Sequence, residues 1–570
     1  MEGGMPWLAF YGDVPSSLDY PEKTMYELVR DIAHDLPGGI AWEFMGTRST
    51  YAELIRDIDG CADALASRGV KLGDRVTVSL PNCPQAVILF YALNKVGAVA
   101  SMIHPLSAAA EIEFYLSESR SSWIVILDAF YPSAAAAADG AGAQTILVCS
   151  IGDFLGPAMR LGFWVSSGRK IPKVPAADSR VLVWSDFLAG PRPTRCDATP
   201  LGPDECAVIL YSGGTTGTPK GVMLSSRNFN ALGMQVGTQG PITAGEVILS
   251  ILPVFHGFGL GVCVHTFLAA GGTCVLVPRF TSATVAKLVR KFRPHYMAGV
   301  PTLFESLMRD PVFAKTDLSC FKLIYAGGDK LPETIKERFD AFLAERGGRT
   351  SLFEGYGLTE SVTACIATPK TAYRPGSVGI PLPDMRAKIV APETTQELPA
   401  GTDGELCVSG PTVMLGYLNS PEDTAATIRR HADGRLWLHT GDLCSMDREG
   451  FVYFRLRMKR IIKVSGVSVT PTLVEGLLDR HPDVELSCVI GVPDARKLQT
   501  VKAYVVLKDR RSANGAKERE LIEYCAQNLI KWSVPESIEF RDALPLTRIG
   551  KVAYSELERE HGQKTGRGPA

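Results

Sequence analysis

The chain lacks several features that would place it in whole classes of protein. Its 60 Lys and Arg residues nearly cancel its 61 Asp and Glu residues, so no overall positive charge attracts nucleic acid and no such partner is expected. The 13 cysteines include no CxxC pair and no His/Cys cluster at zinc spacing, which predicts reduced thiols. No basic region opens the N-terminus, so no signal peptide is expected. These absences predict a cytoplasmic protein.

Charged side chains are also absent from residues 247–278, a run long enough on paper to span a bilayer. Pro253, His256, His265 and the pair Gly271-Gly272 divide this run into pieces of strand and helix length. We therefore expect a buried strand–helix–strand unit there instead of a membrane span.

A length of 570 residues exceeds what one hydrophobic core supports and predicts two to four domains. A capping box at residues 50–53 predicts the start of a helix. Strand-length apolar runs then alternate with helix-length ones as far as residue 127. This alternation predicts a doubly wound α/β arrangement, in which helices cover both faces of a parallel sheet.

The pattern changes twice in the second half of the chain. From Gly376 onward, short strands broken by Gly and Pro predict a β-rich subdomain. Near residue 457 the chain becomes basic and polar, and a last set of helices and strands follows. The predicted fold class is α/β, with a large N-terminal domain over residues 1–456 and a small α+β C-terminal domain over residues 457–570.

The most informative stretch is residues 211–222, which read YSGGTTGTPKGV. Glycines let backbone N–H groups approach an anion closely, the hydroxyls add donors, and Lys220 adds a positive charge. The stretch is not a Walker A loop, because Pro219 precedes the lysine and Gly221 stands where the metal-binding Ser/Thr would be. A plain flexible loop is the alternative. The apolar runs on both sides favour a phosphate-binding turn between two buried strands.

Residues 154–175 form a basic and aromatic stretch that Pro interrupts. Its basic residues are Arg160, Arg169, Lys170 and Lys173. It also contains Phe154, Phe163 and Trp164 and has no acidic residue. Such a stretch can lie at an anionic membrane surface, with its aromatic rings at the level of the headgroups. An ordinary solvated connector is an equally good interpretation.

Five motifs in this order resemble the acyl-adenylate-forming (AMP-binding) superfamily, which includes acyl-CoA synthetases, firefly-type luciferases and adenylation domains. They are residues 211–222, YGLTES (356–361), HTGDL (439–443), residues 457–475 and PLTRIGKVAY (545–554). The resemblance covers nearly the whole chain. It implies that a carboxylate attacks the α-phosphate of ATP to give acyl-AMP and pyrophosphate, and that coenzyme A then takes the acyl group as a thioester.

The resemblance also implies the residues that contact ATP. The β- and γ-phosphates would be held by Ser212, Gly213, Gly214, Thr215, Thr216, Gly217 and Lys220. Adenine would lie between Tyr356 and the backbone of Gly327 and Gly328, and the ribose would bind Asp442 with the help of Arg457.

Further positions match residues at the reacting atoms. Glu360 would be the Mg²⁺ ligand, Thr359 would touch the α-phosphate, and Lys551 would reach both anions from the C-terminal domain. An isolated Glu, Asp or Lys is usually only a solvated surface charge, and the linked motifs change that expectation for Glu360, Asp442 and Lys551. His256 would lie beside the substrate carboxylate, although its apolar neighbours also suit a core histidine.

The second half-reaction implies a mobile C-terminal domain that rotates about a hinge near Lys459. Lys463 and Gly466 would then line the entrance for the thiol. Because the chain ends soon after Lys551, we expect free coenzyme A to be the acceptor and not a carrier domain. The family often has an acidic residue after the hinge lysine, and Arg460 stands there instead.

The acid is less clearly indicated than the reaction. The 154–175 stretch is similar to an insert in bacterial fatty acyl-CoA synthetases. Gly257, Gly259 and Gly261, in the segment expected to line the acyl pocket, suggest room for a long apolar group. We therefore expect a medium- to long-chain fatty acid and a role in lipid metabolism. An aryl or sterol-like acid is the alternative substrate, and a luciferase-like monooxygenase or a non-catalytic nucleotide-binding protein are alternative functions.

Overall fold

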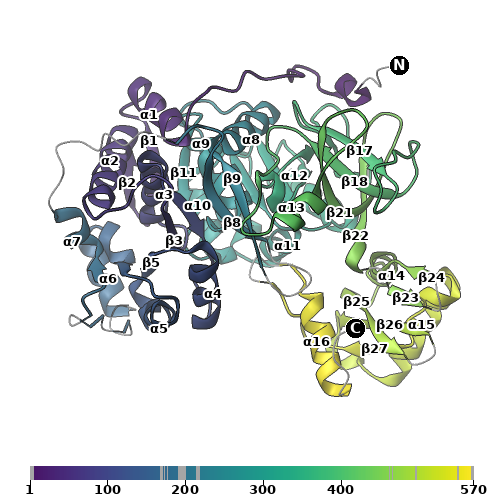
Figure 1. Ribbon diagram of the computed structural model, residues 1–570. Helices are drawn as coiled ribbons and strands as arrows, with labels where there is room; N and C mark the ends of the chain where they lie inside the picture. Colours follow the sequence, from purple (N-terminus) through teal and green to yellow (C-terminus); the bar gives the residue numbers. More distant parts are fainter. Residues whose placement is uncertain are drawn as a thin grey trace.

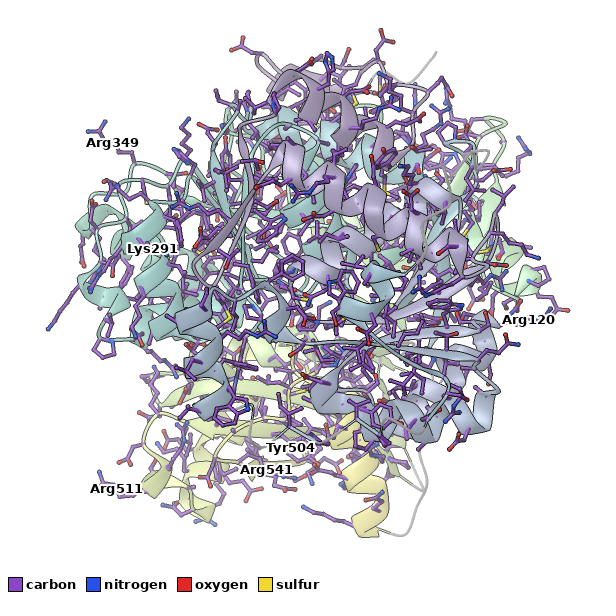
Figure 2. The ribbon with its side chains drawn as sticks, turned by 90° about the vertical axis from the view of Figure 1, so that its left-hand side faces the viewer. Arg120, Lys291, Arg349, Tyr504, Arg511 and Arg541 are labelled. Carbon is purple, nitrogen blue, oxygen red and sulfur yellow. The ribbon has the colours of Figure 1, made fainter. Side chains whose placement is uncertain are left out.

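The computed structural model describes residues 5–166, 168, 171–172, 174–175, 178–190, 201–212, 219–460, 462–464, 467–494, 497–547 and 551–565. Three sheets with their helices form a large N-terminal domain, and a fourth sheet forms a small C-terminal domain that lies below it (Figure 1). Figure 2 shows the same division from the side, with Arg120, Lys291 and Arg349 on the large domain and Tyr504, Arg541 and Arg511 on the small one.

The first sheet has the strand order β19-β9-β8-β4-β3-β5-β6-β7. Strands β3 to β8 run parallel to their neighbours, whereas β9 is antiparallel to β8, and β19 is antiparallel to β9. Its strands are β3 (Arg75–Ser79), β4 (Val99–Met102), β5 (Trp123–Leu127), β6 (Thr145–Cys149), β7 (Val181–Val183), β8 (Cys206–Ser212), β9 (Lys220–Ser225) and β19 (Gly416–Tyr417). The helices from this part of the chain are α2 (Tyr51–Ser67), α3 (Pro84–Val96), α4 (Ala109–Ser119), α5 (Tyr131–Ala141), α6 (Pro157–Ser166) and α7 (Trp184–Ala189).

The second sheet has the order β16-β15-β14-β13-β12-β10-β11-β1-β2 and a parallel centre. Its strands are β1 (Ile40–Phe44), β2 (Thr47–Thr50), β10 (Val247–Ser250), β11 (Thr273–Leu276), β12 (Tyr296–Gly299), β13 (Leu323–Gly327), β14 (Leu352–Tyr356), β15 (Ile366–Ala367) and β16 (Ile380–Pro381). The other helices of the large domain up to residue 345 are α1 (Met25–Asp35), α8 (Ser226–Gln239), α9 (Thr266–Leu268), α10 (Ser282–Phe292), α11 (Pro301–Arg309) and α12 (Glu333–Glu345), together with a π-helix at Phe258–His265.

The third sheet is the predicted β-rich part, with β17 (Arg386–Val390), β18 (Gly404–Ser409), β20 (Ile428–Arg430), β21 (Leu436–Met446) and β22 (Val452–Arg457), and α13 (Pro421–Thr427) beside it. The C-terminal sheet contains β23 (Ile462–Val464), β24 (Val467–Val469), β25 (Val484–Asp494), β26 (Leu498–Leu507) and β27 (Ser537–Phe540). The C-terminal helices are α14 (Pro471–Leu478), α15 (Gly515–Asn528) and α16 (Tyr554–Thr565).

Local sequence signals explain where several of these elements begin. The Thr50 hydroxyl accepts the backbone N–H of Glu53 at 3.2 Å, and the Glu53 carboxylate accepts the N–H of Thr50 at 2.8 Å, so the predicted capping box starts α2. The charge-free run forms β10, the π-helix with α9, and β11, as predicted. No helix among the described residues is long and apolar enough to cross a membrane.

The small domain has its own hydrophobic core and makes specific polar contacts with the large one. Arg309 of α11 forms an ion pair with Glu485 of β25, with 2.7 Å between Nη1 and Oε1. The Thr472 hydroxyl of α14 donates to the Arg455 carbonyl of β22 at 2.7 Å. These contacts hold the small domain in the position from which Lys551 reaches the large domain.

Candidate active site

The predicted phosphate-binding turn connects β8 and β9, which pair antiparallel so that Ser212 lies opposite Lys220. The two buried strands expected on either side of the turn are therefore present. Residues 213–218 themselves are outside the described residues, and with them the predicted contacts Gly213, Gly214, Thr215, Thr216 and Gly217.

Tyr417 brings the cation and the carboxylate of the candidate phosphate site together. Because β19 pairs with β9, Tyr417 lies opposite Val222. Its hydroxyl donates to Glu360 Oε1 at 2.8 Å, and Lys220 Nζ lies 4.9 Å from the centre of its ring. Lys220 also forms an ion pair with Asp423 Oδ1 of α13 at 2.7 Å. Sequence reasoning missed Tyr417 and Asp423, because no local motif signals a contact that depends on the pairing of distant strands.

Glu360 has the chemistry of a Mg²⁺ ligand. It lies in the 3₁₀ helix Thr359–Ser361, which two residues separate from the end of β14. Both Glu360 and Thr359 are half-buried. Among the residues that the structure describes, no Lys or Arg forms an ion pair with its carboxylate, which the Tyr417 hydroxyl alone contacts by a side-chain hydrogen bond. A carboxylate with open lone pairs beside a phosphate site fits this hard cation, which takes carboxylate and phosphate oxygens.

Asp442 is the most deeply buried charge of the site, with 2% of its surface exposed. The register of β21 and β22 places it opposite Arg457, whose Nε lies 3.0 Å from Oδ1, and Tyr356 donates to Oδ2 at 2.6 Å. The Arg457 ion pair is not aligned as a hydrogen bond, so within the described residues Oδ1 is a buried oxygen without a hydrogen-bond donor. Burial raises the pKa of the Asp442 carboxyl, against the opposing effects of Arg457, Tyr356 and Lys551. Such an oxygen suits the hydroxyl groups of a ribose.

Lys551 crosses from the C-terminal domain to the carboxyl end of β13. A Cβ added at Gly328, whose φ is +83°, would lie 3.7 Å from Lys551 Cε. Burial lowers the pKa of the Lys551 ammonium, while the carboxylates of Asp329 and Asp442 oppose that shift. Gly327 ends β13 directly before this contact. The backbone of Gly327 and Gly328, the proposed adenine contact, therefore lies beside the catalytic lysine candidate.

His256 precedes the π-helix and lies close enough to Lys551 to be affected by its charge. Burial, and then the positive charge of Lys551, lower the pKa of the imidazole to about 4. The ring is therefore neutral at neutral pH. Its Nδ1 accepts the backbone N–H of Phe258 at 3.1 Å, which places the ring proton on Nε2. His256 can thus donate a hydrogen bond to an anion that binds near Lys551.

Comparisons with known proteins show the family to which the chain belongs. A family model for AMP-binding enzymes matches residues 29–418, and one for the C-terminal domain of the same enzymes matches residues 473–551. The chain belongs to the AMP-binding enzyme family. A long-chain-fatty-acid–CoA ligase from Bacillus subtilis is 34% identical over 98% of this chain and 99% of that protein. A feruloyl-CoA synthase from an Amycolatopsis species is 31% identical over 92% of this chain and 96% of that protein.

Solved structures give the same result for the fold. The crystal structure of ATP-bound MatB from Rhodopseudomonas palustris superimposes with a TM-score of 0.81, covers 95% of this chain and 100% of that one, and is 27% identical. The expected α/β fold with a large and a small domain is confirmed. The enzyme is an acid–CoA ligase of the adenylate-forming type, and ligases of this type use ATP, Mg²⁺ and CoA.

The glycines beside His256 have a different role from the one that the sequence suggested. A Cβ at Gly257 would lie 1.8 Å from the Val362 carbonyl oxygen, and one at Gly259 would lie 2.1 Å from that of Pro253. At Gly261 it would meet a Leu232 methyl at 2.6 Å. These glycines let the enzyme's own backbone and side chains pack closely, so the expectation that they open space for a long substrate is wrong.

Val362 shows what this close packing holds in place. It follows the 3₁₀ helix of Thr359 and Glu360, and its φ of +62° lies where β-branched residues are rarely found. Its carbonyl fits against Gly257. The strained turn therefore ties the segment that contains Thr359 and Glu360 to the segment that contains His256, which fixes their relative positions.

The residues expected to act in the second half-reaction are only partly described. Lys463 lies in β23, but the structure describes its backbone alone, and Gly466 is outside the described residues. Lys459 lies in the 3₁₀ helix Met458–Arg460 that joins β22 to β23. Arg460 binds within the small domain: its Nη2 lies 2.6 Å from Glu475 Oε1, and its guanidinium lies 4.6 Å from the centre of the Tyr554 ring.

Proposed function

We propose that this ligase activates a medium- to long-chain fatty acid with ATP and transfers the acyl group to CoA. A carboxylate oxygen attacks the α-phosphorus of ATP and pyrophosphate leaves. The CoA thiolate then attacks the acyl carbon and AMP leaves. The observation that carries this proposal is the placement of the half-buried Lys551 beside Gly328 and near Asp442 and His256. A positioned cation next to a neutral hydrogen-bond donor offsets the repulsion between the carboxylate and the α-phosphate as they approach each other.

Each residue of the site has a proposed task in the first half-reaction. Ser212 and Lys220, with the turn that joins them, bind the β- and γ-phosphates. Asp442 and Arg457 orient the ribose, and Tyr356 holds Asp442 in place through its hydroxyl. Lys551 stabilises the charge that develops between carboxylate and α-phosphate, with Thr359 and His256 as hydrogen-bond donors. Glu360 would hold Mg²⁺, which when bound neutralises phosphate charge.

The identity of the acid is the finer part of the proposal. The relatives named long-chain-fatty-acid–CoA ligases support a fatty acid, and the feruloyl-CoA synthase keeps an aryl acid as the second candidate. ATP–pyrophosphate exchange should be measured with medium-chain and long-chain fatty acids, a hydroxycinnamic acid and a bile acid. We expect the highest kcat/KM with a fatty acid. Faster exchange with the hydroxycinnamic or bile acid would overturn the substrate assignment and leave the ligase reaction intact.

We also propose that the domains divide at residues 456 and 457 and that the small domain turns about Lys459 between the half-reactions. The contact between Lys551 and Gly328 supports the proposal that this position of the small domain is the one for adenylation. A different face of the small domain, with Lys463 and Gly466, would then meet the site when the thiol enters.

Replacing Glu360 by glutamine should raise the Mg²⁺ concentration needed for half-maximal adenylation, because the metal loses a charged ligand. An amide oxygen can still accept the Tyr417 hydrogen bond, so the substitution removes charge with little change in shape. A Mg²⁺ titration of pyrophosphate release measures the effect. Tyr417→Phe is the matched control, since it removes the hydrogen bond and keeps the carboxylate. An unchanged Mg²⁺ dependence of Glu360→Gln would show that this carboxylate is not at the metal.

The segment over residues 154–175 supports a proposed peripheral contact with the inner face of the membrane. Leu161, Trp164 and Val165 of α6 are 64%, 52% and 55% exposed, beside the exposed Arg160. Phe154 does not take part, because it packs edge-on against Trp42 with 5.7 Å between ring centres, and Phe163 packs against the same core. The apolar part of the proposed membrane contact therefore consists of two aliphatic residues and one tryptophan. Of its basic residues, Arg169, Lys170 and Lys173 are outside the described residues.

Changing Arg160, Arg169, Lys170 and Lys173 together to glutamine should abolish co-sedimentation with anionic vesicles. Each basic residue near such a surface contributes about 1 kcal/mol, so binding by the wild type should be weak and salt-sensitive. The control variant changes Arg120, Lys291, Arg349 and Arg511, four exposed basic residues outside residues 154–175, and should still sediment. If the wild type stays in solution even at low salt, the segment is only a connector.

A further inference from the structure

A buried cluster of one thiol and two imidazoles lies in the third sheet, outside the site described above. Strands β18 and β21 pair so that Cys407 lies directly opposite His439, and His431 follows β20, which pairs with the other edge of β21. Ligand atoms of the three side chains all lie within 4.8 Å of one another, and all three residues are buried. Thiol and imidazole are the ligands that Zn²⁺ and similar borderline-soft ions prefer.

A carboxylate orients one of the imidazoles in the way that metal-binding histidines are usually held. His439 Nδ1 lies 2.8 Å from Glu405 Oε2, and Glu405 Oε1 accepts the backbone N–H of Gly441 at 3.0 Å. With its Nδ1 proton donated to Glu405, His439 presents the lone pair of Nε2 to the cluster. This carboxylate–histidine arrangement fixes the tautomer and increases the basicity of the ligating nitrogen.

The second imidazole, that of His431, faces the first through its Nε2 atom. His431 Nε2 lies 2.9 Å from His439 Nε2, and among the described residues His431 Nδ1 has no hydrogen-bond partner although it is buried. Because His439 Nε2 accepts in this pair, His431 Nε2 carries the ring proton, and the unpartnered Nδ1 can take up that proton when an ion binds to Nε2. Two imidazole nitrogens on one tetrahedral zinc stand about 3.3 Å apart at normal bond lengths, so a small outward shift of His431 makes room for an ion.

We propose that Cys407, His431 and His439 bind a transition-metal cation of the Zn²⁺ class, with Glu405 positioning His439. On binding, the Cys407 thiol proton passes to solvent and the His431 ring proton moves from Nε2 to Nδ1, so that sulfur and two nitrogens donate to the metal and a fourth position is left for water. Residues 432–436, in the turn next to His431, are exposed, so the cluster lies close to solvent along the chain. Strand β21 also carries Asp442, so the ion would lie beside the strand that binds the nucleotide.

A second cluster, His481 with Asp483 and Glu520, has a suitable spacing but already has a cation. Lys517 Nζ lies 2.8 Å from Asp483 and 2.7 Å from Glu520. This cluster offers one half-buried and one exposed carboxylate and no thiol. It therefore serves as an internal control and not as a second proposal.

Cobalt(II) titration of the EDTA-treated full-length enzyme tests the proposal. Co²⁺ replaces Zn²⁺ and gives a near-ultraviolet charge-transfer band only when a thiolate is a ligand. We expect this band in the wild type, its displacement by Zn²⁺, its loss in Cys407→Ser, and roughly 10–100-fold weaker binding in Glu405→Gln. His481→Ala should bind as the wild type does. Zn²⁺ should also raise the thermal unfolding midpoint of the wild type but not of His431→Ala.

Two results would overturn the proposal. One is a wild type that shows no thiolate band and no Zn²⁺-dependent rise in the midpoint. The other is a band of the same strength in Cys407→Ser, which would place the ion at another of the cysteines. Unfolding of each variant in EDTA shows whether it is folded, and His431→Ala gives a second variant outside the β18–β21 pair.

Discussion

Alanine in place of Lys551 is expected to slow acyl-AMP formation by roughly 10²–10³-fold and to leave thioester formation from supplied acyl-AMP nearly unchanged. The ammonium lies at the carboxyl end of β13, near Asp442 and His256, where carboxylate and α-phosphate would meet. Its charge is needed while two anions approach. Thioester formation does not need this charge, because the carboxylate and the α-phosphate are already joined in acyl-AMP when the CoA thiolate attacks the acyl carbon.

The two half-reactions should be measured separately for this variant. Pyrophosphate release in a single turnover reports the first, and CoA consumption with supplied acyl-AMP reports the second. Lys497→Ala is the matched control, since Lys497 is an exposed lysine of the same domain that pairs with Glu536, and it should change neither rate. An equal loss in both half-reactions would contradict the role assigned to Lys551.

Sequence alone predicted the parts of the site that depend on neighbouring residues. The β8–β9 pair around the glycine-rich turn, the capping box of α2 and the strand–helix–strand unit over residues 247–278 all follow from local patterns of apolar, capping and turn residues. The motifs also contain Glu360, Asp442 and Lys551, which lie in one region of the molecule. Local patterns suffice for the strand pair, the capping box and the strand–helix–strand unit, whereas the three site residues come from distant segments and were predicted together from the family resemblance alone.

The remaining features depend on register between segments far apart in the chain. Tyr417 reaches Lys220 and Glu360 only because β19 pairs with β9, and His431 reaches His439 only through the β20–β21 hairpin. The role of the glycines at 257 and 259 was predicted wrongly for the same reason, because the sequence shows that a side chain is absent but not which atoms of the protein occupy that space. Pairing and packing of this kind are decided by the whole core.

Proline in place of Lys459 should abolish thioester formation and spare acyl-AMP formation. Lys459 lies in a 3₁₀ helix, where φ is about −50° to −70°, and proline fixes φ near −65°. The arrangement with Lys551 at β13 therefore tolerates proline in this first helical turn. Rotation of the small domain requires a large dihedral change at the hinge, which proline prevents.

The contacts on either side of Lys459 explain why the change must occur there. Arg457, the last residue of β22, is bound to Asp442 and therefore stays with the large domain although it is the first residue after the proposed boundary. Arg460 is bound to Glu475 and Tyr554 and moves with the small domain. Only Met458 and Lys459 lie between these two anchors. Single-turnover assays of both half-reactions should show normal rates for Lys459→Ala, and for Lys459→Pro a normal first rate with a second rate at background. A Lys459→Pro enzyme that makes acyl-CoA at the wild-type rate would move the hinge to another position.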